Sequence, residues 1–418
     1  MVAFIPQRTQ VLVLGGGPAG STAAALCAQA GLSTVLVERE RGPRFHIGES
    51  LMPDTYSTLR RLGVLERMKG SRHTAKFSVQ FVTETGKESQ PFYFFENNPH
   101  ECAQTWQVVR SEFDAMLVDN AASHGVTVLE GCQARDVHMD GARATGARIH
   151  PRDGAEFDIQ ADVVIDATGQ TALIAHKLGL KNPDPLLKKA SVWTYFEGAA
   201  REPGNLDEGA TLVLATQNKK GWFWYIPLKD NVVSVGVVSG LNDLFPPGGT
   251  RDLEFLFNEQ LERCPAAAKR VAPGKRVSPY FTTKDFSYRC DNVAGDGWVL
   301  VGDAFGFLDP IYSSGVFLAL KSGEMAADAV INGFATRDLS AATLGAWGPN
   351  YLKGMERMKR LVYAFYEGFN FGNFIRRHPE MKRHLIDLLI GDLFKDSVDE
   401  IVAPLDAMRA EMALAASA

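Results

Sequence analysis

The chain has 418 residues, 45% of them apolar and 22% charged, with a formal net charge of −5 at pH 7. These proportions are typical of an ordinary globular protein, and the length allows one large core or two to three subdomains. The negative net charge, without a long block of Lys and Arg, gives no electrostatic reason to expect a nucleic-acid partner.

The five cysteines are scattered without CxxC spacing, which argues against a zinc site and against a disulfide framework. We therefore expect no bound metal and a reducing, cytoplasmic location. The N-terminal residues lack the apolar region of a signal peptide, and no uninterrupted apolar run reaches the roughly 18 residues that suggest a membrane span. The sequence thus predicts no membrane span.

A strand, a glycine-rich turn and a helix are predicted near the N-terminus. The apolar run 11–14 is typical of a buried parallel strand, and an Ala-rich helix is expected over about 21–30. Between them, Gly15 permits the sharp bend, Gly17 lets a pyrophosphate approach the backbone, and Gly20 lets helix and strand pack closely. Because the N-terminus of a helix favours phosphate, this unit predicts a dinucleotide site.

The second strand, 34–37, is followed by Glu38, about 20 residues past the glycines, where a carboxylate usually accepts hydrogen bonds from a ribose 2′-OH. A carboxylate here disfavours a 2′-phosphate, so FAD or NAD fits and NADP does not. Two later segments, 161–169 and 298–304, are apolar strands that end in small residues, and the second reaches Asp303. An acid at such a strand end can bind ribityl or ribose hydroxyls; two ordinary sheet strands are the alternative. A further GxGxxG unit does not follow a later strand, so we predict no NADH site.

These two strand ends resemble the ATG and GD motifs of FAD-dependent enzymes of the para-hydroxybenzoate hydroxylase type. Arg110, shortly before the pair Phe113-Asp114, also resembles that group, in which such an Arg supports the FAD. The resemblance implies an α/β protein with a Rossmann-like FAD-binding fold of this type, a mixed β-sheet substrate domain and a C-terminal helical region. We place the FAD-binding domain at 1–82, 105–187 and 280–330, the substrate-side β-sheet domain at 83–104 and 188–279, and the helical region at 331–418.

Three further segments are similar to motifs of the flavin-dependent halogenases: HIGESLMP at 46–53, WFWYIP at 222–227 and GDAFGFLDPIYSSGV at 302–316. The aromatic-rich run 363–371 resembles the branch that acts on phenols, pyrroles and related electron-rich rings. Tryptophan-specific members carry a Glu just before the S-S/T-G turn, whereas Tyr312 stands here. We therefore do not expect free tryptophan as the substrate.

The resemblance implies an FADH2-dependent halogenase of secondary metabolite biosynthesis that uses O2 and chloride or bromide. Hypohalous acid made at the flavin travels to a lysine, which forms a haloamine or hydrogen-bonds the acid beside the substrate ring. The expected partners are a separate flavin reductase that supplies FADH2 and a small aromatic substrate, free or attached to an acyl or peptidyl carrier protein. The alternatives are an FAD-dependent aromatic monooxygenase, a geranylgeranyl-reductase-like flavoprotein, and a flavin-binding protein without chemistry.

The resemblance places the delivery lysine at Lys76. A Lys at a strand entrance is usually a solvated surface residue, and Lys69 and Lys87 are nearby rivals. The family usually has a Gly after the Lys-aromatic pair, whereas this chain has Ser78.

The resemblance places the halide at Ser314 and Gly315, before a helix expected from about Val316. Backbone N–H groups at a helix start form a natural anion site. The alternative is an N-cap serine with no anion beside it. The sequence alone leaves both interpretations open.

In the WFWYIP strand, alternate residues project from opposite faces, and such an aromatic strand is most often buried core. The resemblance adds a barrier that keeps the substrate away from the flavin, formed by Trp222, Trp224, Ile226 and Pro227. The two interpretations do not compete, because a buried ring can also be a wall.

The remaining expectation concerns contact with FAD. The positions that we expect to contact it are Gly15, Gly17, Pro18, Ala19, Gly20, Ser21, Glu38, Arg39, Ile47, Gly48, Glu49, Ser50, Arg110, Ala134, Ala167, Gly169, Gly302, Asp303, Pro310, Gly315 and Val316.

Overall fold

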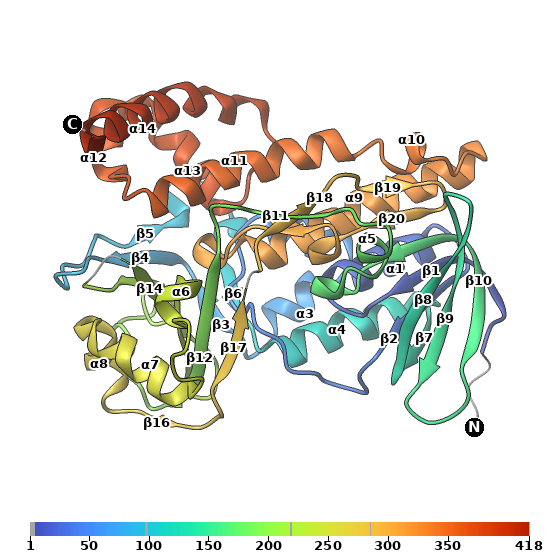
Figure 1. Cartoon of the computed structure of the whole chain (residues 1–418), viewed down its shortest axis with the longest axis horizontal. Helices are drawn as coiled ribbons and strands as arrows, with labels where there is room; N and C mark the ends of the chain where they lie inside the picture. The colour runs from blue at the N-terminus through green and yellow to red at the C-terminus, as the bar shows by residue number, and fades with distance from the viewer. Residues whose placement is uncertain (1–4, 97–98, 218–219, 285, 418) are drawn as a thin grey trace.

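Two large sheets stand side by side, and a group of C-terminal helices covers them along one side (Figure 1). The computed structural model describes residues 5–96, 99–217, 220–284 and 286–417. The first sheet is parallel at its centre and the second is mainly antiparallel. The α/β class expected from the sequence is confirmed.

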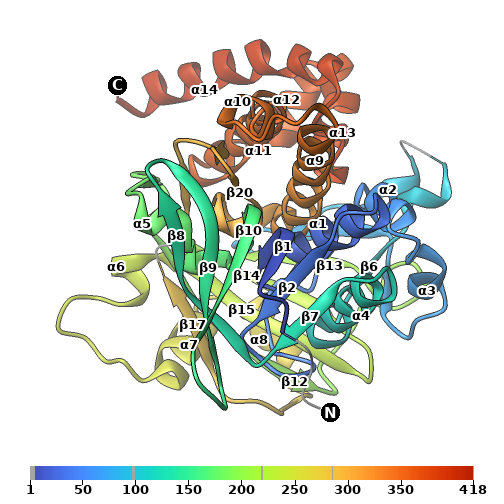
Figure 2. The same cartoon turned by 90° about the vertical axis from the view of Figure 1, so that its right-hand side faces the viewer.

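The first sheet has the central strand order β20-β10-β1-β2-β7, and all four of these pairings are parallel. The apolar runs of β1 and β2 are buried because the strands are covered on both faces. Figure 2 shows β1, β2 and β10 together, with α9 and α11 above them. The strands are β1 (Arg8–Leu14), β2 (Thr34–Glu38), β7 (Thr127–Glu130), β8 (Cys132–Asp140), β9 (Arg143–Pro151), β10 (Phe157–Asp166), β19 (Ala294–Gly295) and β20 (Trp298–Leu300).

The second sheet has the order β16-β12-β15-β14-β13-β4-β5, and β17 also pairs with β12. Its strands are β4 (Ser78–Val82), β5 (Phe92–Tyr93), β12 (Lys189–Glu197), β13 (Thr211–Ala215), β14 (Gly221–Pro227), β15 (Val232–Gly240), β16 (Lys275–Arg276) and β17 (Phe281–Lys284). Two of them, β4 and β17, lie within ranges that the sequence assigned to the other unit. Their partners, β13 and β12, are far away in the sequence, so local pattern could not place this boundary.

Short strands and helices connect the sheets. The strands are β3 (Thr74–Lys76), which pairs with β6 (Thr105–Gln107), and β11 (Lys181–Pro183), β18 (Tyr288–Cys290) and β21 (Gly306–Phe307). The helices are α1 (Pro18–Gln29), α2 (Thr55–Arg61), α3 (Leu65–Lys69), α4 (Arg110–Ser123), α5 (Leu173–Lys177), α6 (Leu241–Leu244), α7 (Leu253–Glu262), α8 (Pro265–Val271), α9 (Ser314–Thr336), α10 (Ala341–Leu344), α11 (Gly348–Tyr366), α12 (Phe371–Arg377), α13 (Lys382–Ile390) and α14 (Val402–Ser417).

Two helices begin earlier than the sequence indicated. Helix α1 begins at Pro18 rather than Ser21, because proline has the backbone angle of a first helical turn and its missing N–H has no partner there anyway. Helix α9 begins at Ser314 rather than Val316, directly after Ser313, which adopts a left-handed conformation with a φ of 58°. Both expected turns are therefore shorter in the structure.

Strand β14 carries the WFWYIP segment and is buried along its whole length. Trp222, Trp224 and Ile226 belong to the large core shared with the first sheet. Phe223 and Tyr225 belong to a second core beneath α7 and α8. The predicted alternation is confirmed, and the tryptophan face is the one turned toward the nucleotide-binding sheet.

The sequence predicted neither a membrane span nor a metal site. Among residues 5–96, 99–217, 220–284 and 286–417, no helix combines the length and the hydropathy needed to cross a bilayer. Within the same ranges, no cluster of His, Cys, Asp and Glu has the arrangement of a metal site.

Candidate functional site

The glycine turn between β1 and α1 is held against the end of β10. A Cβ on Gly20 would lie 1.9 Å from the Gly15 carbonyl oxygen, and a Cβ on Gly15 would lie 2.3 Å from the Ala167 carbonyl oxygen. No side chain fits at either position, so the close approach requires glycine. A Cβ on Gly17 would meet only the flexible end of Arg44, at 3.1 Å. The backbone at Gly17 is therefore the open side of the turn, as a pyrophosphate would require.

Glu38 lies at the end of β2 and faces this turn. Its Oε2 accepts a hydrogen bond from the Gly16 N–H at 2.7 Å, and Arg44 Nε lies 3.7 Å from the same oxygen. A carboxylate placed here can also accept hydrogen bonds from ribose hydroxyls. The turn thus fits the pyrophosphate of a dinucleotide, and Glu38 fits its ribose hydroxyls, as the sequence predicted.

Arg110, at the start of α4, fixes the segment 46–53. This segment contains Gly48-Glu49-Ser50 and is called the GES segment from here on. Its Nε and Nη2 form a bidentate ion pair with Asp114 at 2.8 and 2.9 Å, and its Nη1 donates to the Ile47 carbonyl oxygen at 2.6 Å. Gly48 has a φ of 102°, and a Cβ there would lie 3.0 Å from Arg110 Nη1 and 3.6 Å from Val316. The segment is thereby held between the starts of α4 and α9.

The remaining expected FAD positions are distributed around the same sheet. Burial raises the pKa of Asp303 to about 6, while Arg110 and Lys181 act in the opposite direction. Ala134 pairs with Ile149 in the β8–β9 ladder and is half-buried. Arg39 is exposed, and its Nε lies 3.7 Å from a carboxylate oxygen of Glu40. Among the expected FAD contacts, Arg39 is the one whose side chain is exposed to solvent.

Lys76 is buried rather than solvated, with a relative exposure of 2%. Its Nζ lies 2.8 Å from Ser50 Oγ and 3.0 Å from the Leu51 carbonyl oxygen, both within hydrogen-bond distance, and 5.5 Å from the centre of the Phe94 ring. Burial lowers the pKa of the amine to about 7. The rival Lys69 is a surface residue that pairs with Glu66 and Glu101, and Lys87 is exposed.

The Lys76 amine faces an apolar cavity. Its apolar walls come from Met52, Val79, Phe81, Phe92, Phe94, Ile311 and Leu389. Its polar lining, besides the lysine, comes from Thr211, Tyr312 and Ser313. The cavity thus joins the second sheet, the C-terminal helix α13 and the turn before α9. Apolar walls with a few polar groups are typical of small-molecule sites, but this cavity, at about 20 Å³, is much smaller than such sites usually are.

The turn before α9 brings the predicted halide residues to this region. Asp309 Oδ1 accepts a hydrogen bond from the Ile311 N–H at 3.0 Å, and Ser314 is buried. A Cβ on Gly315 would lie 2.8 Å from the Phe307 ring, so the backbone there must be glycine. Ser313 precedes the helix, but its side chain accepts no cap hydrogen bond from the described N–H groups of α9. The capping role that serves as the alternative is therefore not used.

Trp222 of β14 is connected to this turn by a tyrosine that the sequence did not single out by itself. Trp222 Nε1 donates to the Tyr366 hydroxyl at 3.1 Å, and that hydroxyl donates to Asp309 Oδ2 at 3.0 Å. Burial raises the pKa of Asp309 to about 7. The position of Tyr366 within an aromatic run was visible in the sequence, but its partners were not.

Trp224 connects to the GES segment through a similar bond. Its Nε1 donates to Ser234 Oγ at 3.1 Å, and Ser234 lies 3.4 Å from Glu49 Oε2. Tyr195 donates to the other Glu49 oxygen at 2.5 Å. Burial raises the pKa of Glu49 to about 7, although these hydrogen bonds oppose the effect. Both tryptophan nitrogens are therefore satisfied, and the rings are fixed in place.

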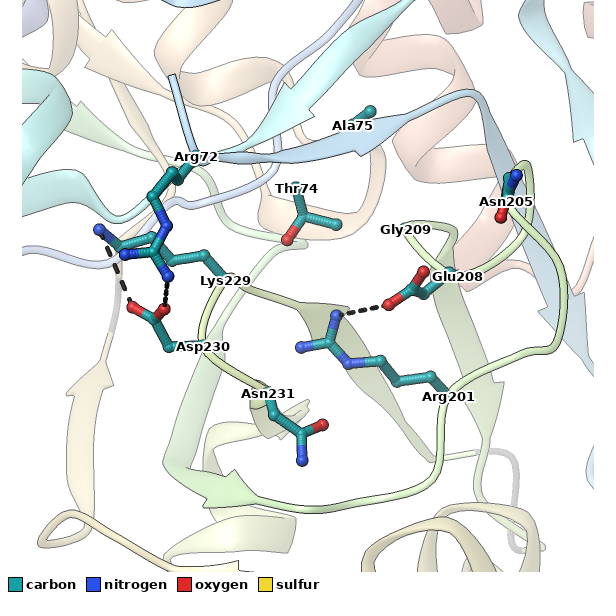
Figure 3. Close-up of a pocket in the computed structure, with 10 residues that line it drawn as sticks. All are labelled: Arg72, Thr74, Ala75, Arg201, Asn205, Glu208, Gly209, Lys229, Asp230 and Asn231. Atoms are coloured by element: carbon teal, nitrogen blue, oxygen red, sulfur yellow. Dashed lines mark hydrogen bonds and ion pairs between the residues drawn. The ribbon is translucent and has the colours of Figure 1, made fainter. Parts of the chain in front are cut away.

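A second cavity, of about 360 Å³, is lined in part by Thr74 and Ala75 of β3 (Figure 3). Its charged side chains are paired with one another or with close neighbours: Arg72 with Asp230, and Arg201 with Glu208 at 3.5 Å. Lys229 forms an ion pair with Glu112, just outside the cavity. Because its charges are already matched and it holds none of the predicted site residues, we do not assign the chemistry to it.

Comparisons with known proteins agree with this geometry. The family model described as FAD binding domain matches residues 8–329. The chain is 34% identical over 348 residues to the flavin-dependent halogenase armH3 of Armillaria mellea, an alignment that covers 79% of this chain and 68% of that protein. It is 30% identical over 388 residues to the 1H-pyrrole-2-carbonyl-peptidyl-carrier-protein brominase of Pseudoalteromonas luteoviolacea, covering 92% of each.

Two solved structures extend the likeness to three dimensions. The myxobacterial chondrochloren halogenase superposes with a TM-score of 0.81 at 31% identity, over 87% of this chain and 84% of that one. The flavin-dependent brominase Bmp2 superposes with a TM-score of 0.86 at 28% identity, over 97% and 99%. The glycine turn, the GES segment and the buried lysine therefore lie on a scaffold shared with these enzymes, and the chain belongs to the flavin-dependent halogenases.

Proposed function

We propose that this enzyme halogenates a neutral, electron-rich aromatic ring such as a phenol or a pyrrole, with Lys76 as the group that delivers the halogen. The observation that carries the proposal is the buried Lys76 amine, which faces an apolar cavity. A lysine is rarely buried unless it is paired, and a carboxylate is absent from the described residues that line this cavity. A functional role accounts for such a group better than a structural one.

Each part of the site has a proposed task. Gly17, Glu38 and the GES segment would hold FAD, which in its reduced form supplies the electrons for O2 to oxidise the halide. The backbone of Ser314 and Gly315, at the start of a helix of 23 residues, would hold the halide. Hypohalous acid would then reach the Lys76 amine. In that step an N–X bond forms, the O–X bond breaks, and the lost N–H proton leaves with the hydroxide as water.

The second step transfers the halogen to the substrate. A ring carbon takes it from the haloamine, and the ring proton restores the N–H bond, so Lys76 is regenerated. Apolar walls and aromatic neighbours such as Phe94 favour a flat, uncharged ring. Tyr312 occupies the position at which a carboxylate would activate a less reactive ring. This supports a substrate that is already electron-rich.

The proposed substrate is either free or attached to a carrier protein. Support for the attached form comes from the brominase of Pseudoalteromonas luteoviolacea, whose name gives a pyrrole on a peptidyl carrier protein as its substrate. A separate reductase would supply FADH2, because the sequence contains no second dinucleotide motif. A screen of free phenols and pyrroles against their carrier-bound forms, with both halides, distinguishes these cases.

Product analysis tests the proposed reaction. The enzyme is supplied with reduced FAD, O2 and bromide or chloride, and the products are identified by mass spectrometry. We expect the isotope pattern of a halogenated ring. A hydroxylated product would instead identify an aromatic monooxygenase, and intact substrate across the screen would contradict the proposed substrate class.

We predict that Trp222→Phe uncouples the oxidant from halogenation. The change removes the Nε1 donor to Tyr366 and shortens the ring on the tryptophan face of β14. Halogenated product per O2 consumed should fall, while hydrogen peroxide or hydroxylated product rises. Phenylalanine is chosen because truncating a buried tryptophan to alanine costs about 3–5 kcal/mol and would confound the test.

The matched control for Trp222→Phe is Phe223→Leu, a conservative change on the opposite face of the same strand. It should leave the ratio of halogenated product to O2 unchanged. If Trp222→Phe behaves like Phe223→Leu, the tryptophan face does not separate oxidant from substrate.

A further inference from the structure

A chain of hydrogen bonds runs from the backbone of the second sheet to the Lys76 amine. Gln107 Nε2 donates to the Gly209 carbonyl oxygen at 2.9 Å and to Thr211 Oγ1 at 2.8 Å. Thr211 Oγ1 lies 3.0 Å from Ser50 Oγ, which lies 2.8 Å from Lys76 Nζ. All four side chains are buried. Water therefore cannot freely reorient their hydrogen bonds.

The Gly209 carbonyl oxygen fixes the orientation of the Gln107 amide. If the amide were reversed, its oxygen would face the carbonyl oxygen of Gly209, and two acceptors would oppose each other. Gln107 Nε2 therefore uses both of its hydrogens, one on Gly209 and one on Thr211. Gln107 Oε1 is buried and has no hydrogen-bond partner within the described part of the chain. Gln107 thus offers the hydroxyl groups of Thr211 and Ser50 a hydrogen-bond donor but no acceptor.

The two hydroxyls of Thr211 and Ser50 carry two hydrogens between them. One hydrogen can lie between the two oxygens, which are 3.0 Å apart, and the other must find an acceptor outside the pair. Of the described groups that bond to this pair, Gln107 Nε2 only donates, so Lys76 Nζ is the one that can accept this hydrogen. A neutral amine has a lone pair that accepts this hydrogen, whereas an ammonium group has three donors and no acceptor.

The protonated form of Lys76 therefore leaves one buried hydroxyl hydrogen without an acceptor among the residues that the structure describes. Leaving a buried donor without a partner destabilises that state. Charged neighbours that could offset this cost are absent from the described cavity lining, where Tyr312 is the one other titratable group. Its hydroxyl donates to the Leu361 carbonyl oxygen at 3.3 Å, away from the amine.

We infer that Gln107, Thr211 and Ser50 are positioning residues that leave the hydroxyl pair one acceptor short and so hold Lys76 as a neutral amine. The inference rests on the proposed role of Lys76 and deepens it, because the lone pair is what takes a halogen from hypohalous acid. The direction of the hydrogen bonds adds to the effect of burial, which alone lowers the pKa of Lys76 to about 7. The site would then select the amine form before any substrate arrives.

Two substitutions at one position test this inference. Thr211→Asn supplies a carbonyl oxygen that can accept the Ser50 hydrogen, without adding a charge. The pKa of Lys76 should then rise by about one pH unit, which corresponds to one hydrogen bond of about 1.4 kcal/mol. Thr211→Val has nearly the same shape as threonine but offers no acceptor. It should not raise the pKa.

The measurement is an NMR titration of the protein labelled with 13C at the lysine ε-carbon. The Lys76 signal is identified as the one missing from Lys76→Met. If Thr211→Asn and Thr211→Val raise the midpoint equally, or if Thr211→Asn does not raise it, the inference is wrong. Circular dichroism of each variant shows that it is folded.

A second measurement on the same variants, the pH profile of halogenation, separates this inference from the proposed function. The acidic limb of the pH profile for halogenation should shift upward in Thr211→Asn together with the NMR midpoint. Thr194→Val, a buried threonine on β12 that bonds to Ser278 and Pro279, should change neither measurement. If the midpoint moves but the halogenation profile does not, the hydrogen-bond chain stands and the role of Lys76 in delivery fails.

Discussion

Lys76→Met should abolish halogenation while FAD binding and the oxidation of reduced FAD continue at their normal rates. The side chains have similar length, so the substitution removes the amine and keeps the volume beside Phe94. The hypohalous acid then has no amine to react with, and we expect halogenated product to fall to background. Flavin oxidation is followed by absorbance, and halogenated product is followed by mass spectrometry.

This variant should also be more stable than the wild type at neutral pH. The pKa of Lys76 is lowered to about 7 in the folded protein, whereas an unfolded lysine titrates near 10.5. Between these values the unfolded chain binds more protons, so the contribution of Lys76 to the free energy of unfolding rises with pH. Its unfavourable contribution is full below about pH 7 and is gone above about 10.5. Urea unfolding of both proteins across this window checks the sign.

Lys87→Met is the matched control, since Lys87 is exposed. It should keep both activities and show no change in the pH dependence of unfolding. Halogenation that persists in Lys76→Met, at a rate comparable to that of Lys87→Met, would remove Lys76 from the proposed delivery step.

Gly17→Ala and Gly20→Ala should fail in different ways, although they lie in the same turn. An added Cβ on Gly20 would stand 1.9 Å from the Gly15 carbonyl oxygen, so the turn itself cannot form and the protein should not fold. An added Cβ on Gly17 would meet only the end of Arg44. We expect Gly17→Ala to fold normally but to bind FAD at least about tenfold more weakly, a loss of about 1.4 kcal/mol.

The comparison needs two measurements on each variant. Thermal unfolding by circular dichroism reports the fold, and titration with oxidised FAD reports affinity. A Gly17→Ala protein that binds FAD like the wild type would show that the pyrophosphate does not pass over this glycine. A well-folded Gly20→Ala protein would contradict the packing of α1 against β1 and β10.

The nucleotide-binding unit could be predicted because its signals are local. The run 11–14, the glycines and Glu38 lie within one short stretch, and each has a task set by its immediate neighbours. The alternation of β14 was predictable for the same reason, since a strand presents successive side chains to opposite faces.

The boundary between the two sheets could not be predicted in this way. Strand β4 joins the second sheet by pairing in parallel with β13, whose residues lie more than a hundred positions later. Nothing in the composition of 78–82 indicates which sheet it belongs to. The network from Trp222 through Tyr366 to Asp309 was hidden for a similar reason, because it joins three elements that meet only in the folded chain.

The sequence by itself determined the family motifs, the position of Lys76 within them, and the strand on which the tryptophans alternate. Tertiary structure alone set the surroundings that lower the pKa of that lysine. Burial removes the water that would keep an amine charged, and the partners that set the direction of its hydrogen bonds come from β6, β13 and the GES segment. A pKa depends on everything that surrounds a group in space, and no short stretch of sequence contains that information.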